Sequence, residues 1–186
     1  MANAAANAVE ALERLVGRLN WATLGVCKAA AICLIVIMTA IIVTAVFFRY
    51  VLNDSIAWSE EIAKFVMVWM TFIVTPIGLK TGAHIAVEAI SGRLGGRAGH
   101  LMQVSIFLAI ILLMAMFVKE ASFLTWSARI QRASTIDVSI LYVYAAMPIG
   151  CAVTALVAFE FLLKAMKGFL DPARVPPRVQ DPATMA

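Results

Sequence analysis

Few residues of this sequence could do chemistry, and their spacing favours no reaction centre. The two histidines are His84 and His100, and His84 lies in a predicted loop, whereas axial haem ligands normally lie inside a helix bundle. No nucleophile, base and orienting group recur at a recognisable spacing. We therefore expect no enzyme activity and no catalytic residue, and neither a cofactor nor a metal site in this chain.

The most informative polar cluster is Arg49, Trp58, Glu60, Glu61 and Lys64. Adjacent residues in a helix point about 100° apart, so the two carboxylates cannot share one face. At least one of the two carboxylates therefore needs a partner that does not lie on its own face of the helix. Two interpretations stay open: both carboxylates are solvated at a membrane boundary, or Arg49 or another subunit fixes this corner.

The elements that must position these residues are transmembrane helices. Of the 186 residues, 63% are hydrophobic and 14% charged, whereas soluble domains have about 25% charged residues. Charge-free stretches cover 29–48, 65–79, 98–118 and 138–159, and a spanning helix needs roughly 20 apolar residues. The second stretch is the weakest, and a buried or re-entrant helix is its alternative.

We predict an all-α integral membrane protein with four transmembrane helices, preceded by an N-terminal amphipathic interfacial helix. Residues 1–26 form the cytoplasmic or interfacial helix, with Val9, Leu12, Val16 and Leu19 on its apolar face. The transmembrane domain covers 27–164, with spans at about 27–48, 57–80, 98–118 and 138–163. Pro-rich residues 165–186 form a disordered cytoplasmic tail.

Positive charge predicts the orientation. Lys and Arg gather on the cytoplasmic side of membrane proteins, and ten of the 15 belong to the N-terminal segment, the loop between spans two and three, and the tail. The other five, in the two remaining loops, are Arg49, Lys64, Lys119, Arg129 and Arg132. Both termini are therefore expected in the cytoplasm. No basic run is dense enough to bind nucleic acid.

No ionisable residue is centred in any charge-free stretch. Transporters that move ions through their own core tend to place such residues at mid-membrane and to use broken helices in paired repeats. Pro76 and Pro148 fall in spans two and four, where each is expected to bend its helix or interrupt the hydrogen bonding. The pattern argues against a self-sufficient transporter.

Four motifs occur in a recognisable order: FRYVLN at 48–53, WSEE at 58–61, VWMTF at 68–72 and GAHIAVE at 82–88. The chain thereby resembles the small (Q-type) membrane subunit of tripartite ATP-independent periplasmic (TRAP) transporters. STIDVSI at 134–140, Tyr144 and MPIG at 147–150 match the final span more loosely. Val74 stands where the family commonly has glycine, and Glu88 where it commonly has aspartate.

The resemblance implies a small permease subunit of a bacterial inner-membrane complex. It would act as a scaffold for the large TRAP membrane subunit during sodium-driven uptake of an organic acid, with a periplasmic substrate-binding protein as the third component. Sodium and substrate would bind in the large subunit.

Within that resemblance, seven residues are expected to have structural or partner-interface roles. Arg49, Glu60 and Glu61 would order the outer corner between spans one and two. Trp58 and Trp69 would anchor the bundle against lipid or the partner, and His84 and Glu88 would order the cytoplasmic loop. The loop at 120–137 could touch the binding protein. The alternatives are a four-helix membrane cytochrome subunit and a stand-alone small transporter.

Overall fold

The computed structural model describes residues 2–91 and 97–170, and side-chain surroundings over 12–82 and 101–166. The described chain is helical: α1 (Ala2–Tyr50), α2 (Ala57–Ser91), α3 (Arg97–Ser127), the 3-10 turn η1 (Ala128–Ile130), α4 (Leu141–Tyr144) and α5 (Ala146–Leu170). Four of its segments are long and apolar enough to cross a membrane: Leu12–Tyr50, Ala57–Gly82, Leu101–Ile130 and Leu141–Met166. The predicted fold class, an all-α protein with four transmembrane helices, is confirmed.

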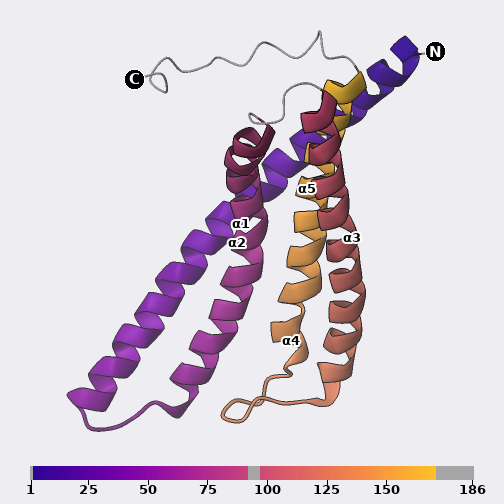
Figure 1. Ribbon diagram of the computed structural model, residues 1–186. Coiled ribbons are helices and arrows are strands. Elements are labelled where there is room, and N and C mark those ends of the chain that lie inside the picture. The colour runs from indigo at the N-terminus through magenta and orange to yellow at the C-terminus, as the bar shows by residue number, and fades with distance from the viewer. Residues whose placement is uncertain (1, 92–96, 171–186) are drawn as a thin grey trace, which may run out of the picture.

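Successive long helices run in opposite directions (Figure 1). We call the end with the α1–α2 turn and residues 128–140 the loop end, and the opposite end, where α1 begins and α5 ends, the terminal end. At the loop end α1 lies away from α3 and α4, whereas at the terminal end α1 crosses close to α5.

α1 is one continuous helix, where we expected an interfacial helix followed by a separate span. Its 49 residues correspond to about 70 Å at 1.5 Å per residue, far more than a hydrocarbon core of about 30 Å. Val16, Asn20 and Leu24, one turn apart, are buried and form its packing face. That face differs from the apolar stripe expected in the sequence, because Leu12 and Leu19 are exposed. An interfacial position for this segment stays a prediction.

α5 is the central helix. Half of its most apolar window is buried, whereas none of that of α1 is. The buried cluster of Leu24, Phe107, Val157 and Phe161 joins α1, α3 and α5. The apolar core is therefore built around α5 rather than shared evenly between the four helices.

At both prolines a residue of a neighbouring helix lies against the freed carbonyl. Pro76 lacks the N–H that would bond to Phe72 O, yet α2 continues to Ser91, beyond the span end expected near residue 80. Gly150 lies directly against that carbonyl, since a Cβ at position 150 would stand 2.6 Å from Phe72 O. Small residues permit such close approach between membrane helices.

Pro148 acts in the same way near the start of α5. It cannot donate to Tyr144 O, and the helix is interrupted at Ala145, between α4 and α5. Thr125 Oγ1 on α3 lies 3.1 Å from that oxygen, although its single proton is shared with Ala121 O at 2.7 Å. Span four is thus two helical pieces, and Thr125 of α3 lies beside the carbonyl oxygen at the break.

Two loops have other bounds than the sequence suggested. α3 continues through Lys119 to Ser127, so the stretch from residue 119 is helical for two further turns, as the sequence allowed. At the other end α2 reaches Ser91, so His84 lies on a helix and not in the loop expected over 81–99. We expected a disordered tail over 165–186, but α5 continues to Leu170, so residues 165–170 are helical. Residues 171–186 lie outside the described residues, as do 92–96.

Gly150→Ala should destabilise the protein, because the added Cβ would meet the Phe72 backbone and force α2 and α5 apart. We expect a loss of about 1–3 kcal/mol, typical of overpacking, measured as a lower thermal unfolding midpoint in detergent. Gly78→Ala is the matched control, since no atom lies within 4 Å of its new Cβ, and it should be neutral or slightly stabilising. Equal midpoints for the two variants would contradict the close contact.

Candidate functional site

The corner at the loop end is closed by an ion pair. Arg49, in the last turn of α1, donates to the carboxylate of Glu60 in the first turns of α2. Asn53, with φ of 55°, allows the intervening chain to reverse, a conformation that asparagine tolerates. Both partners are about half exposed, and a hollow of about 320 Å³ lies beside them between α1 and α2. The ion pair therefore sits at an accessible rim.

Glu61 points elsewhere and holds the loop between α3 and α4. Its Oε1 accepts from Ser134 N and its Oε2 from Thr135 N, each at 2.8 Å, and the Thr135 hydroxyl donates to Oε2 as well. The loop itself is a tight reversal, with Arg132 bridged to Ser139 and ion-paired to Asp137. The two adjacent carboxylates thus bind different parts of the chain. Glu60 pairs with α1, and Glu61 accepts hydrogen bonds from residues 134–135.

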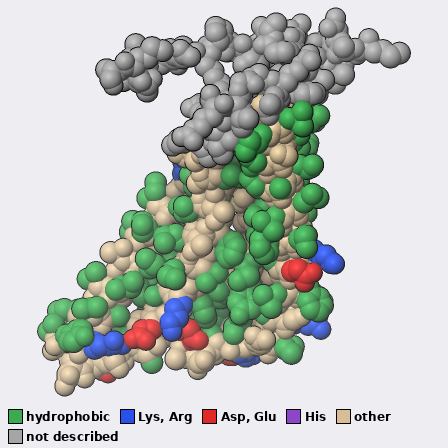
Figure 2. Space-filling model, viewed as in Figure 1, with side chains coloured by type: hydrophobic (Ala, Val, Ile, Leu, Met, Phe, Trp, Pro, Cys, Tyr) green, Lys and Arg blue, Asp and Glu red, His purple; other side chains and the backbone are tan. Residues whose placement is uncertain are grey.

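Trp69 fastens α2 to the start of span four. Its indole Nε1 donates to Tyr142 O at 3.1 Å, within the short helix α4. Trp58 lies in the first turn of α2 and is exposed. Figure 2 shows charged side chains gathered along this end of the molecule, with apolar side chains over the helices above them.

The structure brings only some of the expected residues together. Arg49 and Glu60 touch, Glu61 and Trp58 lie on the same first turns of α2, and Trp69 lies further along that helix. The side chains of the other two expected residues, His84 and Glu88, lie outside the described residues, as does that of His100, the second histidine. Roles at an interface between subunits stay predictions for all seven.

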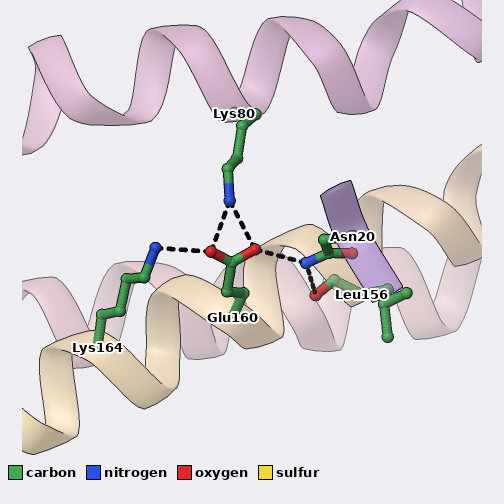
Figure 3. A network of polar contacts seen from close by, with 5 residues as sticks. All are labelled: Asn20, Lys80, Leu156, Glu160 and Lys164. Carbon is green, nitrogen blue, oxygen red and sulfur yellow. Dashed lines mark hydrogen bonds and ion pairs between the residues drawn. The ribbon is translucent and has the colours of Figure 1, made fainter. Parts of the chain in front are cut away.

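A second polar cluster, at the terminal end, was missed in the sequence. Glu160 on α5 is 3% exposed, and its carboxylate accepts from Lys80 Nζ of α2 at 2.5 and 2.6 Å (Figure 3). Lys164 Nζ, one turn along α5, lies 2.6 Å away, and Asn20 Nδ2 of α1 donates at 2.7 Å. We call these four residues the clasp. It joins three helices through one buried carboxylate.

The clasp also rests on an aromatic pair. The rings of Phe161 and Phe107 stack with centroids 5.2 Å apart, which brings in α3. The ammonium groups of Lys80 and Lys164 lie 5.3 and 5.4 Å from the Phe161 centroid, within cation–π range. All four long helices therefore meet at Glu160 and its neighbour.

The sequence held a signal for the clasp. Glu160 directly follows the charge-free stretch 138–159, and Lys80 directly follows the stretch 65–79. With four spans, these two ends lie on the same side of the membrane. The Glu160 carboxylate and the Lys80 ammonium group are therefore expected at a similar depth. They were missed because only charges at the centres of the stretches were considered.

The contacts of Glu61 and Glu160 connect helices and one loop to one another. No group of three or more His, Cys, Asp or Glu side chains that could hold a metal occurs in the described part of the chain. Glu61 and Glu160 each accept several hydrogen bonds from other elements of the fold. Their geometry fits the fixing of helices and of one loop in place.

Glu160→Ala should lower the thermal unfolding midpoint, because it leaves Lys80 and the Asn20 amide facing each other without the carboxylate. Losing one partner of a buried ion pair costs about 3–5 kcal/mol, and partial exposure of Lys80 reduces this to about 2–3 kcal/mol. Lys164→Ala serves as the control, since Lys164 is 40% exposed and should lose only a few tenths of a kcal/mol. A smaller effect at position 160 than at 164 would refute the clasp.

Glu61→Gln should loosen the loop at residues 134–135, because a neutral amide accepts more weakly and faces the same N–H groups with its own donors. Hydrogen bonds to a charged group contribute about 1.5–3 kcal/mol, so exchange of the Ser134 and Thr135 amides should accelerate about tenfold or more. Hydrogen exchange with mass spectrometry measures this. Glu60→Gln, which removes the neighbouring carboxylate, should leave the two amides unchanged.

Comparison with known proteins supplies the family. The family model described as "Tripartite ATP-independent periplasmic transporters, DctQ component" matches residues 38–168, which include the loop-end corner, the 134–135 loop and Glu160. A search of curated proteins found no match. The family is a transporter component and not an enzyme family, and the resemblance seen in the sequence motifs is confirmed. The chain therefore belongs to the DctQ family, the small membrane components of tripartite ATP-independent periplasmic transporters.

Proposed function

We propose that this small permease subunit is a scaffold for the large TRAP membrane subunit in sodium-driven, binding-protein-dependent uptake of an organic acid. The observation that carries the proposal is the way in which two carboxylates are engaged, one buried among the helices and one at the loop end. Glu160 and Glu61 are engaged by the chain's own Lys80, Asn20, Ser134 and Thr135. These two carboxylates are taken up by contacts within the chain, which fits the fixing of helices and of one loop rather than the binding of a transported ion.

Sodium and the organic acid would then bind in the large subunit, and this chain would hold that subunit in position. The clasp supports this role, since a buried carboxylate shared by three helices keeps them from sliding past one another. We further propose an inner-membrane location with both termini in the cytoplasm, which puts the loop end in the periplasm.

The loop end would in that orientation face the substrate-binding protein. The loop over 131–140 is kept in one conformation by Glu61 and by its own bridge between Arg132 and Ser139. A preformed loop loses little conformational entropy on binding. We propose that this loop, together with the Arg49–Glu60 rim and Trp58, contacts the binding protein or the large subunit, that Trp69 keeps the bundle packed, and that His84 and Glu88 order the cytoplasmic end of α2.

Reconstitution into proteoliposomes tests the proposal. With the large subunit, the binding protein and an inward sodium gradient, this chain should support organic-acid uptake. Omission of any one protein should abolish it, and the chain alone should give no flux.

Flux from the chain alone would identify a stand-alone transporter, and a Soret band in the purified protein would identify a cytochrome subunit. Uptake by the large subunit and binding protein without this chain would remove the scaffold role. A tagged chain isolated from native membranes should bring the large subunit with it, as identified by mass spectrometry.

A further inference from the structure

Two charged residues of α3, Lys119 and Glu120, lie at the depth of the most apolar part of the bundle. Two contacts fix the antiparallel register of α3 and α5, one between Thr125 and Tyr144 and one between Phe107 and Phe161. Both place residues 119–120 beside 148–150 of α5. The corresponding level on α2 is Phe72, because its backbone lies against Gly150.

That level is mid-membrane. Phe72 is at the centre of the charge-free stretch 65–79 of α2, and 148–150 are at the centre of 138–159. The helix of α3 that crosses the membrane covers Leu101–Ile130, so Glu120 lies within about 8 Å of its midpoint at 1.5 Å per residue. The sequence predicted otherwise, because span three was expected to end at Val118, just before Lys119.

Both side chains are exposed. Lys119 is 85% and Glu120 71% exposed, and the contact found between them is long, with Lys119 Nζ 3.9 Å from Glu120 Oε1. Figure 2 shows charged side chains on the α3 side of the molecule, away from the rim at the loop end. Ionisable groups at this depth are costly and normally face protein or water rather than lipid. A lysine can stretch toward the headgroups, but the short glutamate side chain cannot reach them.

Glu120 also lines a groove of about 580 Å³ between α2, α3 and α5. Its lining is mostly apolar and includes Phe72, Met114, Phe117 and Gly150. The Thr75 and Thr154 hydroxyls in the groove already donate to carbonyls of their own helices, Thr71 O and Gly150 O. The charged group in the lining is therefore the carboxylate of Glu120.

We propose that this groove and the Lys119–Glu120 pair form the docking site for a transmembrane helix of the large subunit. That helix inserts an apolar side chain between α2 and α3 and presents a hydrogen-bond donor or cation to Glu120. A lipid acyl chain would fill the apolar groove equally well, but it has no donor for a carboxylate at mid-membrane. The site thus recognises a partner helix with an apolar surface and one hydrogen-bond donor or cation. The inference rests on the proposed scaffold function and names the surface that performs it.

The test uses the full chain expressed together with the large subunit and the binding protein. In the variant Lys119→Leu/Glu120→Leu, the amount of large subunit that co-purifies should fall at least about tenfold, as expected when one side of a buried polar contact is lost. If these side chains faced lipid, the same change would favour the membrane-inserted state and leave the complex intact. Lys28→Leu, which removes an exposed charge from α1, is the control and should not alter co-purification.

A photo-crosslinker locates the contact. p-Benzoylphenylalanine in place of Phe117 should form an adduct with the large subunit, whereas the same probe in place of Leu108, on the opposite side of α3 by helical geometry, should react mainly with lipid. Unchanged co-purification of the Leu variant, or lipid adducts alone from position 117, would overturn the docking site. If the unaltered chain retains no large subunit, the proposed function fails instead, so the two failures are distinguishable.

Discussion

The structure depends on a carboxylate buried at the point where four helices meet. Glu160 is nearly inaccessible, and its stability there requires partners, because an unpaired buried charge is costly. Lys80 and Asn20 supply them from α2 and α1, and the neighbouring Phe161 stacks on α3. Apolar helices slide past one another in lipid at little cost, since lipid chains are as apolar as leucine. A buried carboxylate with fixed donors removes that freedom and sets the depth of each helix.

Helix depth, once fixed, determines where the other polar residues lie. With Lys80 level with Glu160, the first turn of α2 reaches the loop end, and Glu61 meets the amides of Ser134 and Thr135. The same register leaves Phe72 against Gly150 and, on α3, Lys119 and Glu120 beside them. The terminal end, the loop end and the exposed charges between them are therefore consequences of one arrangement. Lys80 of the clasp and Glu61 at the loop end belong to the same helix, about 28 Å apart at 1.5 Å per residue.

The sequence predicted the number and type of helices because hydrophobic length is a property of each segment by itself. Charge-free stretches near 20 residues gave the four spans, and the motifs at 48–88 gave the family. Register was not predictable in this way. Lys119 ended a charge-free stretch, and only the contacts of Thr125 and Phe107 with span four place it beside the centres of α2 and α5. The partner of Glu61 was equally hidden, because backbone amides of a distant loop have no signature in the sequence.

The prolines illustrate the same limit at the level of the backbone. Pro76 and Pro148 each lack the N–H that would bond to the carbonyl four residues earlier. A bend or an interruption was therefore expected at both. One interruption occurs, at Ala145, whereas α2 continues past Pro76 for another four turns. The residues beside the two oxygens also differ: a glycine backbone lies against Phe72 O, and a threonine hydroxyl lies near Tyr144 O. The proposed scaffold role needs such contacts between helices, because a scaffold can hold its partner in place only as firmly as its own helices hold one another.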